Sequence, residues 1–73
     1  MATKIRRSAD SFGPNLKRLR TGMTQVEFAA KIDMQPSAIN HFESGRRKPS
    51  LRNLIAIADA LDVGLDVLVL VNR

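Results

Sequence analysis

Residues 23–44 read MTQVEFAAKIDMQPSAINHFES, and the first half of this stretch carries the signals of a helix start. Thr24 and Glu27 have the spacing of a capping box, in which each side chain bonds the backbone N–H of the other residue. Met23 and Phe28 have the spacing of the hydrophobic staple that accompanies such a cap. We therefore expect a helix from Thr24 to about Ile32.

The second half of the stretch predicts another helix after a very short connection, Asp33 and Met34. Gln35 precedes Pro36, and proline is favoured at the first position of a helix. This helix is expected to end before Gly45. Two helices of about two turns each, joined by a tight turn, form the helix-turn-helix pattern.

A helix is expected on the N-terminal side of this pair. Ser11 is placed to cap it, and Phe12, Leu16 and Leu19 follow at the i, i+4 and i+7 positions of a buried face. Gly22 is a natural left-handed stop at its end.

A longer helix is expected on the C-terminal side, capped by Ser50 and ending near Asp62. Its apolar stripe is predicted to be Leu51, Leu54, Ile55, Ala58 and Leu61.

The last segment, GLDVLVLVNR at residues 64–73, is compatible with a helix or a strand. As a helix it is capped by Gly64, whereas its run of β-branched valines favours a strand. A lone strand is not stable in water, so we expect it to pair with the same strand of a second subunit. The predicted dimer interface comprises Leu65, Val67, Leu68, Val69 and Val71.

The chain length of 73 residues allows one domain, and 44% apolar residues are enough for a core. We expect a flexible basic N-terminal arm at residues 1–10. Residues 11–73 are expected to form an all-α helix-turn-helix domain with its dimerisation segment at 65–71. The absence of cysteine excludes disulfides and thiolate metal sites.

The formal net charge of +5 indicates an anionic partner. No apolar run approaches the roughly 18 residues that span a bilayer, so we expect no membrane partner and a cytoplasmic protein. His41 is the only histidine, and no second histidine, cysteine or close carboxylate pair completes a site. We therefore expect no metal, no cofactor and no enzymatic activity.

The helix that begins at Pro36 has a polar face suited to reading base edges in a DNA major groove. Asn40 or Gln35 could bond the N6 and N7 atoms of adenine, whereas Pro36 can offer only an apolar contact. The predicted base-reading residues are Gln35, Pro36, Ser37, Asn40, His41 and Ser44.

Two phosphate-suited features flank this face. One is the amide end of the first helix of the pair, and the other is a basic loop followed by the amide end of the next helix. The predicted phosphate-binding residues are Thr24, Gln25, Arg46, Arg47, Lys48 and Ser50. These features predict sequence-specific binding to double-stranded DNA.

Residues 12 to about 68 resemble the lambda-repressor-like Xre/Cro helix-turn-helix family. The matching motifs are T-Q-x-E-(F/L)-A at 24–29, x-x-S-x-I-x-x-(F/I)-E-x-G at 35–45 and L-x-x-L-x-x-(I/L)-A-x-A-L at 51–61. The resemblance implies a bundle of four or five helices and a DNA-binding regulator that usually acts as a dimer. We therefore predict a transcriptional regulator, most simply a repressor, that binds as a homodimer to a palindromic operator. The resemblance also implies a phosphate contact for Gln25.

The chain departs from the family at several positions. Asp33 stands where the family usually has glycine, and Pro36 is unusual at a reading position. The valine-rich ending resembles HipB-type antitoxins, which gives an alternative function as an antitoxin that binds a toxin partner and autoregulates its operon. Glu43 has the wrong charge for DNA and is expected to pair with Arg18 or Arg20, of which we favour Arg20.

Overall fold

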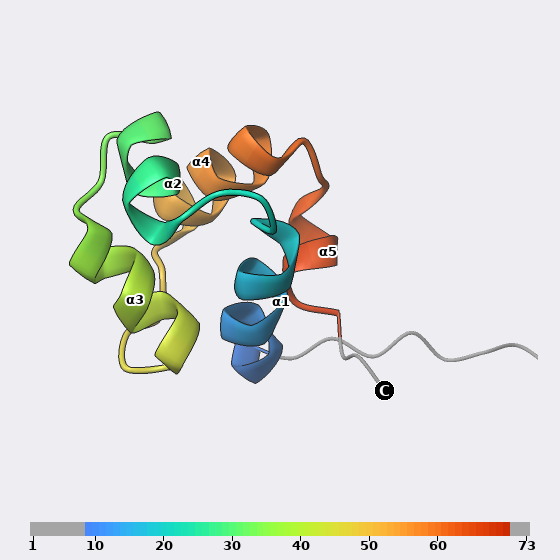
Figure 1. Ribbon diagram of the computed structural model, residues 1–73. Coiled ribbons are helices and arrows are strands. Elements are labelled where there is room, and N and C mark those ends of the chain that lie inside the picture. Colours follow the sequence, from blue (N-terminus) through green and yellow to red (C-terminus); the bar gives the residue numbers. More distant parts are fainter. Residues whose placement is uncertain (1–8, 71–73) are drawn as a thin grey trace, which may run out of the picture.

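The computed structural model describes residues 9–70, which form a short 3-10 turn and five α-helices (Figure 1). The elements in chain order are η1 (Ala9–Ser11), α1 (Phe12–Leu19), α2 (Gln25–Lys31), α3 (Pro36–Ser44), α4 (Leu51–Leu61) and α5 (Leu65–Leu68). The predicted all-α bundle with a helix-turn-helix is confirmed, with α2 and α3 as the pair.

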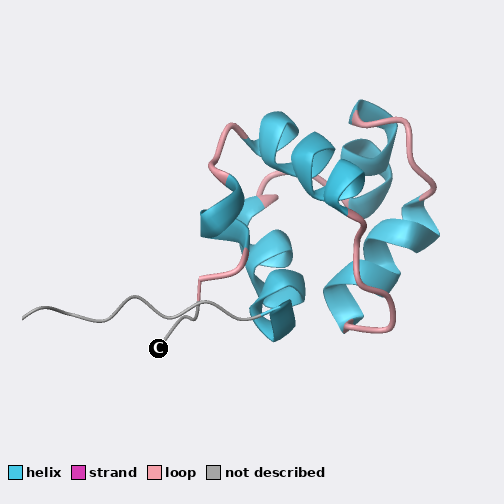
Figure 2. Ribbon diagram, turned by 180° about the vertical axis from the view of Figure 1, so that it is seen from behind, coloured by secondary structure: helices cyan, strands magenta, loops and turns pink. Residues whose placement is uncertain are grey.

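The helices are arranged around one core. α1 packs against α3 on one side and α5 on the other, α2 packs against α3, and α4 packs against α5. Figure 1 shows α1 between α3 and α5, and Figure 2 shows from behind that loops alone connect the helices of the described residues. All five helices contribute to the core, whose buried members are Phe12, Leu16, Phe28, Ala29, Ile39, Phe42, Ile57, Ala58 and Leu68.

The contact between α1 and α3 is unusually close and depends on Gly13. A Cβ atom at this position would lie 2.6 Å from the carbonyl oxygen of Glu43 and 2.7 Å from that of Phe42. One residue earlier, the ring of Phe12 packs edge-on against Phe42, with 6.0 Å between the centroids. A side chain larger than hydrogen at position 13 would therefore force α3 away from α1.

Of the three predicted serine or threonine caps, two form. Thr24 and Glu27 form both bonds of the capping box, and the Ser50 hydroxyl accepts from the backbone N–H of Asn53. The predicted Ser11 cap is wrong: Ser11 has helical backbone angles and makes no capping bond, because η1 already carries the helix back to Ala9. The boundary of the predicted arm at residue 10 is affected too, since Asp10 lies in η1, while residues 1–8 lie outside the described residues.

Two helix connections use aspartate in a left-handed conformation. Asp33 and Asp62 both have φ of 57°, a region that L-residues other than asparagine and aspartate rarely adopt. The first lies in the turn between α2 and α3, and the second ends α4. At position 33 aspartate thus adopts the left-handed conformation for which the family usually has glycine.

The predicted apolar stripe of α4 is only partly correct. Ala58 is buried, and Leu54 and Leu61 pack against the core, but Leu51 and Ile55 are 66% and 45% exposed. The residue that enters the core instead is Ile57, which is fully buried. Because α4 is apolar on several sides, periodicity alone could not predict which side is buried. Packing against the other helices decides it.

The preference for a strand after Gly64 is wrong for residues Leu65–Leu68, which form α5. The buried side chain of Asn15 explains why: its Nδ2 donates to the carbonyl oxygens of Val67 at 3.4 Å, Leu68 at 2.9 Å and Leu70 at 2.7 Å. These bonds satisfy the carbonyl groups at the end of a helical turn, which have no partner within the helix. In a lone strand the backbone carbonyls would have no such partners.

The predicted dimer interface changes with this correction. Leu68 is fully buried within its own chain, so its assignment to an interface is wrong. Val67 and Val69 are half-buried, Leu65 remains 42% exposed, and Val71 lies outside the described residues.

The substitution Gly13→Ala should lower the free energy of unfolding by about 1–3 kcal/mol, because the added methyl overlaps two backbone carbonyls that cannot move independently. Urea unfolding followed by circular dichroism measures the loss. The matched control is Gly64→Ala, whose methyl would meet only the movable Asp66 carboxylate and should cost clearly less. Equal losses for the two variants would contradict this account of the α1–α3 contact.

Candidate nucleic-acid interface

The predicted reading residues lie together on one helix. All six lie on α3 or at its N-cap, Gln35, and Pro36 is the first helical residue as expected. Gln35, Ser37, Asn40 and Ser44 are exposed, while Pro36 and His41 are half-buried. The opposite side of α3 holds Ile39 and Phe42 in the core. The helix therefore presents its polar face to solvent, and this face starts at the helix N-terminus.

Local bonds modify two of these side chains. The Ser44 hydroxyl donates to the carbonyl oxygen of His41 at 3.2 Å, which leaves it an acceptor toward a ligand. Asn40 Oδ1 accepts from Gln25 Nε2 at 3.4 Å, so this predicted base-reading residue is linked to α2.

The basic loop after α3 divides into three different environments. Arg46, Arg47 and Lys48 are all exposed. The Arg47 guanidinium lies over the ring of Phe42, 5.7 Å from its centroid, which holds the cation close to the end of α3. Lys48 Nζ forms an exposed ion pair with Asp10 at 3.4 Å. Arg46 is thus the loop cation best placed for a phosphate, and Lys48 shares its charge with an acid.

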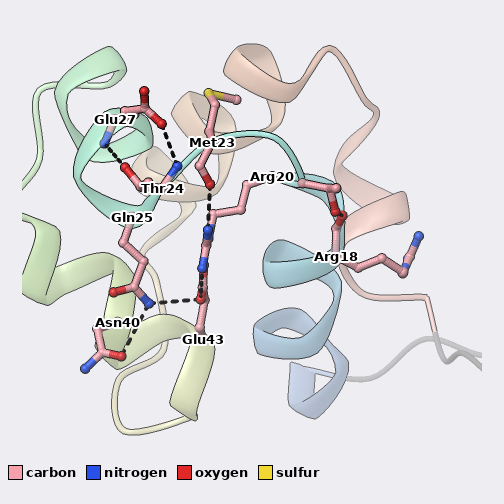
Figure 3. Close-up of polar contacts among 9 residues, drawn as sticks. Arg18, Arg20, Met23, Thr24, Gln25, Glu27, Asn40 and Glu43 are labelled. Carbon is pink, nitrogen blue, oxygen red and sulfur yellow. Dashed lines mark hydrogen bonds and ion pairs between the residues drawn. The ribbon is translucent and has the colours of Figure 1, made fainter.

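The remaining predicted phosphate-binding residues lie at helix starts. Thr24 and Ser50 are exposed and cap α2 and α4, and Gln25 is the half-buried first residue of α2. Gln25 lies beside α3, because its Nε2 also donates to Glu43 Oε1 at 3.0 Å (Figure 3).

Glu43 forms an ion pair with Arg20, the partner favoured from sequence. Arg20 Nε bonds one carboxylate oxygen, and the second terminal nitrogen bonds the other at 2.9 Å. The Arg20 guanidinium also donates to the carbonyl oxygen of Met23 at 2.7 Å. The side chains of Arg20 and Glu43 are only 15% and 5% exposed. Arg18 instead donates to Asn15 Oδ1 at 3.2 Å.

The surroundings of Glu43 keep it ionised. Burial alone raises its pKa, but hydrogen bonds from Arg20 and Gln25, with the charges of Arg20 and Lys17, together lower the pKa below its ordinary value. The hydrogen bond to Glu43 raises the pKa of Arg20 despite its burial. The pair is therefore charged throughout the neutral range.

A cleft of about 360 Å³ lies between the start of α1 and the loop after α3, and Phe12, Phe42, Leu54 and Val69 are among its lining residues. Within residues 9–70 no group of three or more histidine, cysteine, aspartate or glutamate side chains could hold a metal ion. No helix in the described part of the chain is long and apolar enough to cross a membrane.

The role of Asn15, which is 1% exposed and holds the last helix, was not predicted from the sequence. The available signal was its place beside Leu16 on the apolar side of α1, where a polar residue needs a partner. The link from Gln25 to Asn40 was not predicted either, because residues 15 positions apart on two helices give no periodic signal.

The variant Glu43→Gln tests the ion pair. Because the folded-state pKa of Glu43 is lowered, its stabilisation is present at neutral pH and is lost as pH falls below about 4.5. We expect Glu43→Gln to cost about 3 kcal/mol at pH 7, and this difference from wild type to shrink toward pH 3. Urea unfolding at several pH values measures it. The control is Asp59→Asn, an exposed carboxylate on α4, and a Glu43→Gln difference independent of pH would contradict the assignment.

Comparison with known proteins agrees with this geometry. The family description Helix-turn-helix (HTH_3) matches residues 16–68. The control protein C.MunI of Mycoplasma sp is 40% identical over 60 residues, which cover 78% of this chain and 81% of that protein. The transcriptional repressor RstR of the cryptic phage CTXphi, from Vibrio cholerae, is 35% identical over 52 residues, which cover 71% of this chain but only 46% of RstR.

Two solved structures share the fold. The restriction-modification controller protein C.AhdI from Aeromonas hydrophila superposes with a TM-score of 0.76 at 34% identity, covering 82% of this chain and 94% of C.AhdI. The hypothetical transcription factor NHTF from Neisseria superposes with a TM-score of 0.75 at 19% identity, covering 96% and 85%, and shows the fold alone. The prediction that the chain is not an enzyme is confirmed by these relatives, which are transcriptional regulators and controller proteins. The chain belongs to the lambda-repressor-like helix-turn-helix family of DNA-binding transcriptional regulators.

Proposed function

We propose that this protein regulates transcription in the cytoplasm by placing α3 in the major groove of a specific double-stranded DNA site. The observation that carries the proposal is the exposed polar face of α3, from the Gln35 cap to Ser44, backed by the core residues Ile39 and Phe42. The major groove admits one α-helix, and amide, hydroxyl and imidazole groups match the donors and acceptors of its base edges.

Phosphate contacts would hold α3 in register. Arg46 supplies an exposed cation directly after α3, and the chain carries a formal net charge of +5. Phosphate contacts fix orientation, whereas base contacts select the sequence. The two kinds of contact therefore predict different effects of mutation.

Asn40→Ala should lower affinity for the preferred site but not for random DNA, because Asn40 is assigned to bases. Arg46→Ala should weaken binding to both DNAs alike. It should also reduce the magnitude of the slope of log K against log [salt] by about 1. Fluorescence anisotropy with the selected site and a scrambled duplex, at several salt concentrations, measures both.

The two variants are controls for each other. Equal losses on both duplexes for Asn40→Ala would remove it from the base contacts. A salt slope near zero for the wild type would refute phosphate binding altogether.

We further propose that the protein acts as a two-fold dimer on a palindromic operator, with half-sites roughly 34 Å apart. Large apolar side chains left exposed on the two C-terminal helices support a subunit interface: Leu51 and Ile55, one turn apart on α4, and Leu65 on α5. A domain of this size without disulfides gains stability from such an interface. This surface replaces Leu68 as the apolar centre of the proposed contact.

Ile55→Glu should convert the dimer to a monomer, because a carboxylate would be buried without a partner at the interface. Analytical ultracentrifugation measures the mass. The matched control is Val26→Glu, which alters another exposed apolar side chain, 63% exposed on α2, and should leave the mass unchanged. A monomeric wild type, or two variants with the same mass as wild type, would contradict this interface.

The relatives suggest a biological setting. C.MunI and C.AhdI, of which the alignments cover 81% and 94%, are both controller proteins, and C.AhdI controls restriction-modification. We propose that this protein represses transcription and that it is a compact controller protein like these relatives. Neighbouring genes for a nuclease and a methyltransferase would support this setting.

The antitoxin alternative stays a prediction with less support. It rested on a valine-rich C-terminal strand, and residues Leu65–Leu68 of that segment are helical. Co-expression with the product of the adjacent gene tests it, because an antitoxin would co-purify with that product in a stoichiometric complex.

A further inference from the structure

A continuous chain of polar contacts leads from the buried ion pair to the exposed reading face. Arg20 bonds Glu43, Glu43 Oε1 accepts from Gln25 Nε2 at 3.0 Å, and the same nitrogen donates to Asn40 Oδ1 at 3.4 Å. Figure 3 shows these side chains in sequence, with Gln25 of α2 reaching down between Asn40 and Glu43 of α3. The exposed end of this chain is Asn40.

The ionised carboxylate fixes the direction of every bond in the chain. A carboxylate can only accept hydrogen bonds, so Gln25 must turn its NH₂ group, and not its oxygen, toward Glu43. The second hydrogen of that NH₂ group is then available to Asn40, which must accept it with its side-chain oxygen. The opposite orientation of either amide would bring two acceptors or two donors together.

We propose that Gln25 is a positioning residue for base recognition, which fixes the Asn40 amide so that Nδ2 is the group offered to DNA. The inference rests on the proposed function. Offered as a donor, Nδ2 selects a base with an acceptor on its major-groove edge: guanine through O6 or N7, adenine through N7, or thymine through O4. Cytosine, which presents only its N4 donor there, is rejected by Asn40.

This role differs from the phosphate contact expected for the Gln25 side chain. Both hydrogens of its amide are directed at Glu43 and Asn40, so the group left for a ligand is Oε1. An oxygen cannot donate to a phosphate oxygen. Gln25 therefore affects sequence preference without touching a base, and the two roles predict different data.

The test uses the full chain and begins by selecting bound sites from random duplex DNA with wild type and Asn40→Ala. The position at which Asn40→Ala loses preference is the base pair read by Asn40. Affinities are then measured for four duplexes that differ only at this pair, with wild type, Gln25→Met, Asn40→Ala and the double variant. Methionine keeps the length of the side chain and removes its hydrogen bonds.

We expect Gln25→Met to reduce discrimination at that pair by about 3- to 10-fold, the range for one neutral hydrogen bond. The double variant should discriminate no less than Asn40→Ala alone, because the two residues act on one contact. The matched control is Val26→Met, which places methionine at the next position of α2, 63% exposed, and should leave this pair unaffected. Urea unfolding establishes that each variant is folded at the assay temperature.

A uniform loss for Gln25→Met on all four duplexes and on random DNA, with a smaller salt slope, would make Gln25 a phosphate ligand and overturn the proposal. A second measurement separates this outcome from failure of the proposed function. In the DNA-free protein, Gln25→Met should shift the NMR resonances of the Asn40 side-chain amide and raise the pKa of Glu43. Unchanged resonances would refute the positioning role whatever the DNA results, whereas shifted resonances without any sequence preference in wild type would refute the function alone.

Discussion

The buried carboxylate of Glu43 is the interaction on which the arrangement of the first three helices depends. It lies near the end of α3 and receives hydrogen bonds from Arg20, just after α1, and from Gln25, at the start of α2. Removing a charge from water is costly, and it is tolerated where hydrogen bonds and an opposite charge compensate. Here those groups come from two other helices, so the compensation fixes where the helices lie. Gly13 contributes from the other side by allowing the α3 backbone to approach α1.

Local signals in the sequence predicted much of the fold. The capping box at Thr24 and Glu27 needs only neighbouring residues, and it formed as expected. The stripe of α4 could not be predicted in full, because the helix is apolar at Leu51, Ile55 and Ile57 alike and packing alone decided which enter the core. The strand preference of the valines after Gly64 failed for a similar reason: the bonds from Asn15 span more than 50 residues and override a local propensity.

In the candidate site, too, local patterns could be predicted from the sequence and contacts between distant residues could not. The exposed face of α3 was predictable because polar residues repeat with the helical period and Ile39 and Phe42 fix the inner side. Arg20 could be favoured over Arg18 as the partner of Glu43 from the apolar stripe of α1. The polarity of the Asn40 amide could not be predicted, since it depends on the ionisation of Glu43 and on a side chain from another helix. In the proposed mode of binding, DNA recognition is thus specified partly by Gln25 and Glu43, which are not assigned to base contacts.

The buried side chain of Asn15 has a consequence for synthesis of the chain. The carbonyls that its amide bonds belong to Val67, Leu68 and Leu70, which are synthesised 52 to 55 residues after Asn15. Until those residues emerge, burying Asn15 would leave its Nδ2 group without these three acceptors. The carbonyls of α5 and Leu70 therefore complete the core around α1 in the described residues. Packing of the described domain thus requires synthesis to have passed Leu70, which lies 55 residues after Asn15.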